Sequence, residues 1–319
     1  MIFERGKLLS NLKDICANGR VSNLYIFEGE RGIGKKTVSD YFANMLICED
    51  ASGCGMCQSC KTYKSLAHPD VIVVSEEEKA EMGIDHVRKL IKEVYLKPQL
   101  SKRRVFIIKN AEKLNKSAQN ALLKIIEEPP SYAVFIMLCE NSAMLLNTIL
   151  SRGVKIKIPP LDKESLRKLI DLENDSKADF YISYCAGNVG RLMEIASDEE
   201  FLTMREEVLS GLKCLLKDRY DIYKTLEIFE KYKDRRQSVF NVAETFLRDV
   251  LFLKMGGGMH IINADKKDML NEFNAKISSG ACLEVTDIIE KTNNEIGKYG
   301  NYSLIVQSML IRCWEAING

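Results

Sequence analysis

The first half of the chain alternates short apolar runs with segments that have helical periodicity. Runs with the length and the β-branched or aromatic content of buried strands lie at 24–27, 70–75, 104–108, 133–139 and 154–158. Apolar residues recur every three or four positions, as on one helix face, over 1–22, 35–47, 84–96, 117–127 and 144–150. This alternation predicts an α/β fold with βαβ units and a parallel sheet.

The pattern changes after Pro160, where the predicted strands stop. Shorter helices are expected first, at 162–170, 177–186 and 190–196. Long helices are then expected at 204–216, 218–232, 237–255, 265–275, 282–296 and 301–317. We therefore expect three domains, an α/β domain over 1–160, a small helical domain over 161–203 and a helical domain over 204–319.

A glycine-rich segment joins the first predicted strand to the helix at 35–47, in the sequence LYIFEGERGIGKKT. Glycines there let backbone N–H groups approach phosphate oxygens, and a helix N-terminus adds positive potential. The spacing is that of a Walker A phosphate-binding loop, although a glycine loop alone would indicate only a tight turn. Lys36 stands where a Ser or Thr hydroxyl would hold magnesium. The candidate nucleotide-binding residues are Gly29, Gly32, Gly34, Lys35, Lys36 and Thr37.

Four cysteines cluster in a polar segment that follows this helix, namely Cys48, Cys54, Cys57 and Cys60. Zinc prefers four soft ligands in a tetrahedral arrangement, and two-residue gaps let a tight turn present neighbouring sulfur atoms. A four-cysteine set favours a closed, structural zinc module at 48–60 over a catalytic metal. Disulfides or free buried cysteines are the alternatives. His68 is near in sequence, but its HPD context favours a turn before the next strand.

Composition and charge narrow the range of functional classes to which this protein can belong. The chain has 319 residues, 46% of them hydrophobic and 29% charged, and a net charge of +1, so no global basic field attracts nucleic acid. No apolar run approaches the roughly 20 residues of a membrane span, and the N-terminus lacks the apolar core of a signal peptide. Four of the ten cysteines form this cluster and the other six are scattered, a distribution that suits a reducing cytoplasm with one metal site.

The order of these motifs resembles one protein family. A phosphate-binding loop, the cysteine insert, HPD before a strand, KSAQNALLKIIEEPP at 116–130 and LLNTILSRG at 145–153 together resemble the clamp-loader branch of the AAA+ proteins. The resemblance implies a RecA-like α/β domain with a zinc module, a helical lid and a helical collar. It also implies membership of a pentameric ring that places a sliding clamp on primed DNA, driven by ATP bound in neighbouring subunits.

Two kinds of subunit share this plan, one that hydrolyses ATP and one that does not. Magnesium needs hydroxyl and carboxylate oxygens. Here the loop offers Lys36, and the strand RVFII ends in Lys109 and Asn110 instead of acidic residues, with Glu112 two positions too far along. We therefore expect a degenerate nucleotide site. The alternative is an active ATPase that uses Thr37 as a displaced magnesium ligand, and strong DNA binding by an isolated zinc module is a weaker third reading.

Arg152 is the leading functional residue under this resemblance. The SRG at 151–153 corresponds to a family motif whose arginine reaches the γ-phosphate bound by the next subunit, and such arginine fingers stabilise the charge of phosphoryl transfer. Without the motif, Arg152 would be only a surface arginine after a helix. Arg191 lies where a lid arginine contacts nucleotide, or it packs the lid alone. Glu127 is expected to be a solvated helix end.

Overall fold

The computed structural model describes residues 5–76, 81–170, 175–217, 219–257, 261–296 and 301–319. The chain divides into two compact units. Unit 1 comprises Met1–Leu166 with Gly187–Arg191, and unit 2 comprises Arg167–Ala186 with Leu192–Gly319. The expected division into domains at 160 and 203 stays a prediction. None of the described helices is both long and apolar enough to cross a membrane.

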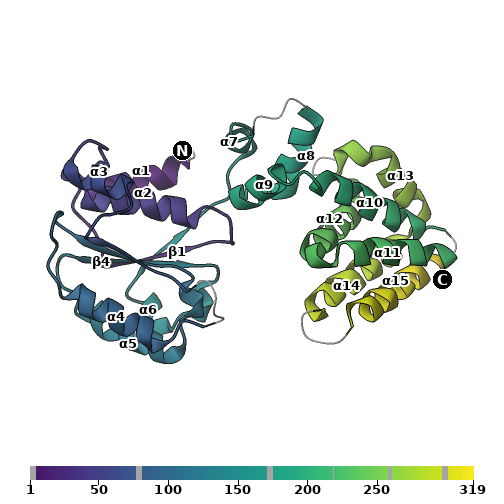
Figure 1. The fold of residues 1–319 in the computed structure, drawn as a ribbon. Helices are drawn as coiled ribbons and strands as arrows, with labels where there is room; N and C mark the ends of the chain where they lie inside the picture. The colour runs from purple at the N-terminus through teal and green to yellow at the C-terminus, as the bar shows by residue number, and fades with distance from the viewer. Residues whose placement is uncertain (1–4, 77–80, 171–174, 218, 258–260, 297–300) are drawn as a thin grey trace. The chain divides into compact units, whose positions relative to one another are not determined.

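Unit 1 is built on a five-stranded sheet whose paired strands are all parallel (Figure 1). The strand order is β2-β3-β4-β1-β5, so β2 and β5 are the edges. All five strands predicted from the sequence are confirmed within a residue or so of their expected ends. Their bounds are Leu24–Glu28 (β1), Val71–Val74 (β2), Arg104–Ile108 (β3), Ala133–Cys139 (β4) and Val154–Lys157 (β5).

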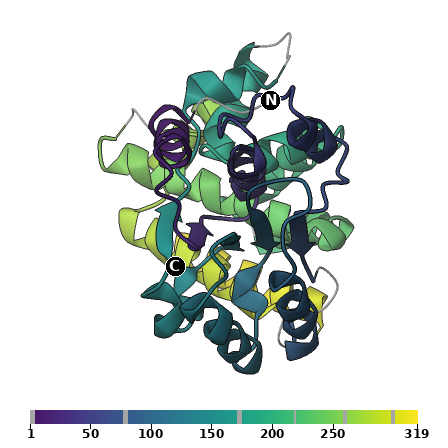
Figure 2. The same ribbon diagram turned by 90° about the vertical axis from the view of Figure 1, so that its left-hand side faces the viewer.

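Helices cover both faces of the sheet, as two views at right angles show (Figures 1 and 2). One layer contains α1 (Gly6–Ala17), α2 (Lys35–Ile47) and α3 (Gln58–Lys64). The other contains α4 (Ile84–Val94), α5 (Lys116–Glu127) and α6 (Asn147–Leu150). Because strand side chains alternate between faces, each strand contributes to two cores.

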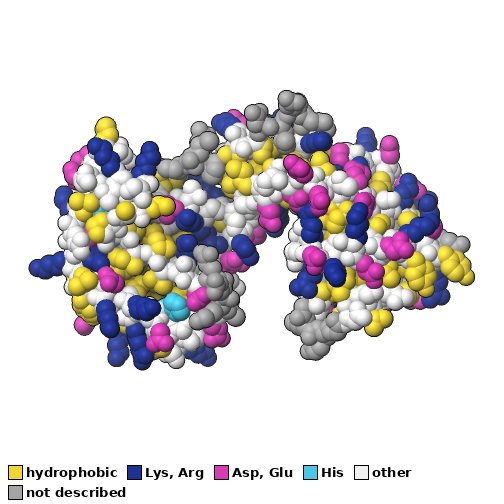
Figure 3. Space-filling model, viewed as in Figure 1, with side chains coloured by type: hydrophobic (Ala, Val, Ile, Leu, Met, Phe, Trp, Pro, Cys, Tyr) yellow, Lys and Arg dark blue, Asp and Glu magenta, His cyan; other side chains and the backbone are white. Residues whose placement is uncertain are grey.

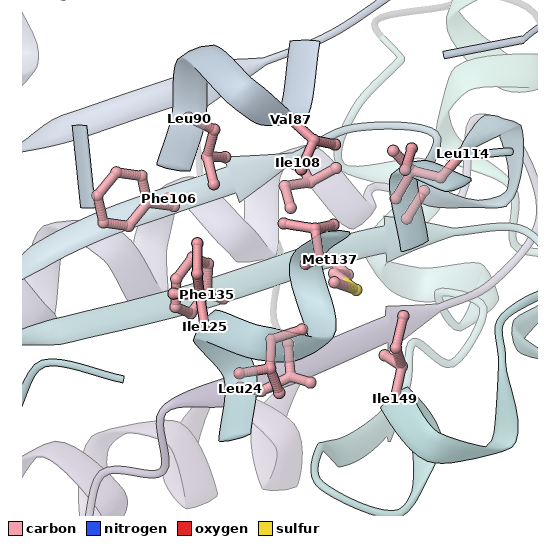
Figure 4. Close-up of a cluster of buried hydrophobic side chains, with 14 of the residues drawn as sticks. Leu24, Val87, Leu90, Phe106, Ile108, Leu114, Ile125, Phe135, Met137 and Ile149 are labelled. Carbon is pink, nitrogen blue, oxygen red and sulfur yellow. The ribbon is translucent and has the colours of Figure 1, made fainter. Parts of the chain in front are cut away.

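Leu24 and Ile26 of β1 belong to the core beneath α4 and α5, whereas Tyr25 and Phe27 pack under α2. In the first core Phe106 and Phe135 stack with ring centroids 5.2 Å apart. Figure 4 shows the side chains of this core converging between the central strands and the covering helices.

Two helix predictions need correction. The helix expected at 144–150 begins only at Asn147, because a short 3-10 turn at Ser142–Met144 precedes it. Helix α3 was not expected at all, since its seven residues are one cysteine, one tyrosine and five polar or charged residues, which show no apolar helical pattern. The sequence also predicts a solvated loop in the charged segment at 76–81, and most of this segment lies outside the described residues.

Unit 2 is helical in all its described parts, as expected. Arg205 of α10 is buried and donates hydrogen bonds to both carboxylate oxygens of Asp265, at 2.7 and 2.8 Å, while its guanidinium stacks 3.6 Å from the Phe180 ring centroid. The helices are α8 (Asp175–Cys185), α10 (Phe201–Cys214), α11 (Ile222–Lys231), α12 (Arg236–Lys254), α13 (Lys267–Lys276), α14 (Ser279–Glu295) and α15 (Tyr302–Asn318). Helices α7 (Lys163–Arg167) and α9 (Val189–Ala196) cross the division between the units.

Candidate functional site: a phosphate-binding loop, a cysteine cluster and an exposed arginine

The glycine-rich segment folds as the sequence predicts, with β1 ending at Glu28 and α2 beginning at Lys35. Gly32 and Gly34 have φ of +82° and +100°, in the left-handed region that favours glycine. The Lys35 ammonium group folds back and donates hydrogen bonds to the carbonyls of Gly29 at 2.6 Å and Glu30 at 3.0 Å. In this structure the Lys35 ammonium group is therefore bonded to carbonyl groups of the loop itself.

A cavity of about 440 Å³ opens over this loop. Its charged lining residues are five basic ones against two carboxylates, so the cavity favours an anion. Burial lowers the pKa of Lys35, while the charges of Glu140 and Glu112 oppose that shift. Glu112 therefore does reach the cavity, although its sequence position suggested otherwise. The charged residues are Arg31, Lys35, Lys36, Lys109, Lys113, Glu112 and Glu140.

The positions that would hold magnesium are occupied by cations. Lys36 and Lys109 both line the cavity, at the places where a hydroxyl and a carboxylate are needed. Thr37 does not line it, and instead lines a second cavity beside β2. The alternative magnesium ligand therefore faces a different cavity from the one over the loop in this structure.

Two side chains that the sequence analysis missed brace the loop. Arg5 is only 7% exposed and donates hydrogen bonds to the carbonyls of Ile33 and Pro159. Asn188 is 3% exposed, and its amide donates to the Arg31 carbonyl at 2.8 Å. Neither position has a sequence signal that would have found it, because both contacts join segments far apart in the chain.

The loop also touches the segment before α9 through its backbone. The Gly190 N–H donates to the Gly32 carbonyl at 2.8 Å, and a Cβ added at Gly190 would lie 2.6 Å from the Gly32 Cα. Both glycines are therefore needed for this close approach. Arg191 follows directly, with its N–H bonded to Asn188 Oδ1 at 3.1 Å, but its exposed side chain is not among the residues that line the cavity.

Arg152 lies on the turn between α6 and β5. One of its guanidinium nitrogens donates to the Thr148 carbonyl at 2.8 Å, and the other pairs with Glu127 at 2.9 Å. The Arg152 side chain is 38% exposed. Glu127 is an exposed helix end, as expected, and its carboxylate also pairs with Arg152, which the sequence did not indicate. Gly153 fits its position tightly, since a Cβ there would lie 2.8 Å from Ile26 Cδ1.

Sheet topology places Arg152 and the phosphate-binding loop at opposite ends of parallel strands. The loop follows the C-terminal end of β1, whereas Arg152 precedes the N-terminal end of β5, and these two strands pair in register from Tyr25 with Val154 to Glu28 with Lys157. Four residues of strand span about 13 Å. Arg152 therefore cannot reach a phosphate on the loop of its own chain.

The four clustered cysteines converge in space. Their sulfur atoms all lie within 4.8 Å of one another, at the end of α2 and the start of α3. Tetrahedral zinc with Zn–S bonds of about 2.3 Å requires sulfur atoms roughly 3.8 Å apart, so small adjustments would complete a site. His68 is not part of this group, because its Nδ1 accepts the Asp70 N–H at 3.1 Å in the expected turn. The four cysteines could bind a metal ion.

Backbone amides around the cluster prepare its sulfur atoms for this role. Burial opposes ionisation of the Cys48 thiol, but N–H groups that include that of Cys54, at 3.4 Å, outweigh it and lower the pKa to about 6. The Cys57 sulfur accepts the Cys60 N–H at 3.4 Å. Thiolates held by N–H groups are the donor set that a closed zinc site requires.

Comparison with known proteins agrees with this geometry. A family model described as DNA polymerase III, delta subunit, matches residues 5–162, and one described as DNA polymerase III, delta subunit, C terminal, matches residues 199–315. The chain belongs to the DNA polymerase III delta-subunit family. The second match decides this point, because it covers the helical region in which the sequence offered no motif.

Individual relatives separate the two kinds of subunit. The DNA polymerase III subunit delta' of Bacillus subtilis is 26% identical over 271 residues, which cover 81% of this chain and 80% of that protein. A subunit gamma/tau of Mycobacterium tuberculosis is 34% identical over only 155 residues, 48% of this chain and 27% of that protein. A gamma subunit-related protein of Thermotoga maritima shares the fold, with a TM-score of 0.53 at 18% identity over 97% of this chain and 99% of that one.

Proposed function

We propose that this chain acts as the delta' subunit of a DNA polymerase III clamp loader. It stands in a pentameric ring with gamma/tau and delta subunits, in the cytoplasm, and through that ring it serves the sliding clamp and primed DNA. The family match along both units supports this assignment over the ATP-hydrolysing gamma/tau alternative. ATP is bound and hydrolysed by the neighbouring subunits.

Arg152 is the residue through which this chain contributes to ATP hydrolysis. The observation that carries this proposal is the position of Arg152 at the end of the sheet opposite its own phosphate-binding loop. An exposed arginine there can serve only a phosphate that another subunit presents. Its guanidinium would stabilise the charge that develops on the transferred phosphoryl group.

This chain's own loop has a different part. With Lys36 and Lys109 at the magnesium positions and Lys35 bonded to loop carbonyls, the site does not support hydrolysis. Gly29, Gly32 and Gly34 shape the turn, and Arg191 belongs to the lid segment that packs on it. We further propose that Cys48, Cys54, Cys57 and Cys60 hold a structural zinc ion, because all four positions are thiols and leave no open coordination site.

The test is ATP turnover by the reconstituted loader with Arg152→Ala. Loss of an arginine finger costs about a thousandfold or more at the affected site, so turnover at one neighbouring site should be abolished. Arg88→Ala is the matched control, because Arg88 is another exposed arginine that pairs with a carboxylate, Asp85, at 3.1 Å. Unchanged turnover in the Arg152 variant would reject the finger assignment. ATP hydrolysis by the isolated chain that disappears with Lys35→Ala would favour the gamma/tau alternative instead.

A further inference from the structure

The edge strand β2 has an unused hydrogen-bonding side. It pairs only with β3, through bonds that include Val105 N–H to Asp70 O at 2.8 Å and Lys109 N–H to Val74 O at 2.9 Å. Because backbone groups alternate in direction along a strand, the N–H and C=O of Val73 point away from β3. Among the described residues no strand pairs with this outer side, and Val73 is 50% exposed.

Each face of β2 is flanked by a cavity. The larger, of about 630 Å³, lies between β2, α2 and α3, and its walls include Val71, Tyr63 and Leu66. The smaller, of about 500 Å³, lies between β2 and α4 and includes Ile72 and Leu90. A strand added to the edge would direct alternate side chains toward these two cavities.

His68 lines the larger cavity and carries a fully enclosed polar atom that has no partner among the described residues. His68 is 6% exposed, and its Nε2 has no hydrogen-bond partner among the described residues. Because Nδ1 accepts the Asp70 N–H, the neutral ring carries its proton on Nε2. This atom is therefore a donor without an acceptor, and burial of such a group is unfavourable unless something binds it.

Leu66 at the rim of the same cavity is unusual in two respects. It is 93% exposed, and its φ of +59° lies in the left-handed region, at the end of α3 where glycine is the favoured residue. A leucine side chain in that position gains nothing from the fold described here. An exposed apolar side chain in an unfavourable backbone conformation beside a cavity indicates a contact with another molecule.

The charges around β2 are mainly positive. Lys36, Lys64 and Lys109 line the larger cavity, and Lys89 and Lys92 line the smaller one. Their acidic neighbours are already engaged, since Asp40 accepts the Tyr63 hydroxyl at 3.2 Å and Glu93 pairs with Arg104 at 2.6 Å. The space-filling view shows hydrophobic side chains with Lys and Arg around them on one face of unit 1 (Figure 3).

We propose that the outer edge of β2 binds an extended acidic peptide segment of a partner protein as an additional strand. Backbone hydrogen bonds to Val73 hold the segment, one apolar side chain enters the larger cavity beside Leu66, and carboxylates face the surrounding lysines. His68 Nε2–H, which is enclosed in the free chain, takes its acceptor from the same segment once binding displaces the side chains that cover it. This binding is separate from the nucleotide chemistry of the ring and does not depend on Arg152.

The experiment uses the full chain and a capped, fluorescein-labelled peptide in which Glu alternates with Val and Phe. Saturable binding by fluorescence anisotropy is expected, and a peptide with Lys in place of every Glu should bind at least about tenfold more weakly. Val73→Pro removes the outward N–H without touching the bonds to β3, as edge strands tolerate. This variant should weaken binding about tenfold.

Two further variants separate binding from folding. Leu66→Gly relieves the left-handed leucine, so the melting temperature should hold or rise while peptide binding falls. Lys64→Glu combined with Lys92→Glu should weaken binding, whereas Lys124→Glu on α5, an exposed lysine outside both cavities, should not. Absence of saturable binding, equal binding of the lysine peptide, or binding undiminished by Val73→Pro would each overturn the proposal. So would a concentration-dependent dimer that Val73→Pro abolishes, because a second copy would then be the occupant.

Discussion

The two ends of the sheet in unit 1 differ in which candidate functional residues they carry and in how those residues are held. At the C-terminal end, the phosphate-binding loop is held by Arg5, Asn188 and the Gly32–Gly190 contact, and its lysine bonds to its own carbonyls. At the N-terminal end, the more exposed Arg152 is held by a hydrogen bond to the Thr148 carbonyl and by an ion pair with Glu127. The C-terminal end has the shape of a nucleotide site but has lysines where magnesium ligands are expected, while the N-terminal end carries Arg152, which we propose acts on another subunit.

The largest expected effect concerns the zinc ion that we propose the four cysteines bind, at the end of α2 and the start of α3. Cys57→Ser should abolish zinc binding and strongly destabilise unit 1, since apparent zinc-binding free energies in small zinc peptides are about 10–16 kcal/mol. Amide hydrogen exchange should increase over 35–64, because α2 and α3 carry the cysteines, but not over 147–152. Zinc content by mass spectrometry and hydrogen exchange are the measurements.

Cys214→Ser is the matched control for this prediction, because Cys214 is a half-buried free cysteine outside the cluster. It should leave both the metal content and the exchange pattern unchanged. Full zinc content in the Cys57 variant would contradict the four-cysteine site. Exchange that increases equally at 147–152 would mean that the two ends are not independent.

An effect of intermediate size is expected from restoring magnesium ligands beside the phosphate-binding loop, at the C-terminal end of the sheet. Lys36→Thr with Lys109→Asp restores a hydroxyl and a carboxylate at the magnesium positions and removes two positive charges. We expect binding of an ATP analogue to become magnesium-dependent, with affinity at least about tenfold higher with the metal than without it. Isothermal titration calorimetry with and without magnesium measures this difference.

Lys36→Thr with Lys113→Asp is the control for the rebuilt site. It makes the same change of charge in the same cavity but leaves residue 109 a lysine. Magnesium dependence in this control would show that charge alone decides, and that the motif positions do not. Equal binding with and without magnesium in the rebuilt chain would show that the braces on the loop, rather than the missing ligands, exclude the nucleotide.

The local sequence pattern was sufficient to predict the strands of the sheet and the glycine-rich loop, but not the side-chain contacts that hold the loop. The bounds of α2 and of β3 and β4 follow from apolar periodicity between glycine and proline signals, which act locally. The braces from Arg5 and Asn188 depend on segments that meet only after folding, and no periodicity encodes them. The short α3 was missed because its seven residues are mostly polar and present no apolar helix face.

The same reason explains why the partner of Arg152 was missed. Glu127 ends α5 and Arg152 precedes β5, and the two meet because both lie at the N-terminal end of the sheet, 2.9 Å apart. The two residues are far apart in the sequence, so the sequence pattern did not indicate their contact, whereas the order of the strands and helices brings them together. The proposed role of Arg152 does not depend on this contact, because it rests on a short motif and stays a prediction.

The smallest expected effect comes from removing the ion pair between Glu127 and Arg152 at the N-terminal end of the sheet. An exposed ion pair contributes about 0.2–1 kcal/mol, so Glu127→Ala should leave the melting temperature nearly unchanged. In the isolated chain this pair competes with any phosphate for the Arg152 guanidinium, and its removal therefore frees the arginine. We expect ATP turnover by the reconstituted loader to rise, by at most about fivefold, which corresponds to about 1 kcal/mol.

Glu128→Ala is the control for this change, since Glu128 is the adjacent carboxylate and makes no ion pair with the described part of the chain. It should leave turnover unaffected. If Glu127→Ala instead lowers turnover as Arg152→Ala does, Glu127 orients the finger in the assembled ring and does not restrain it. In that case the functional residues at both ends of the sheet would be held in place by neighbouring side chains, and the ends would differ only in the kind of residue they carry.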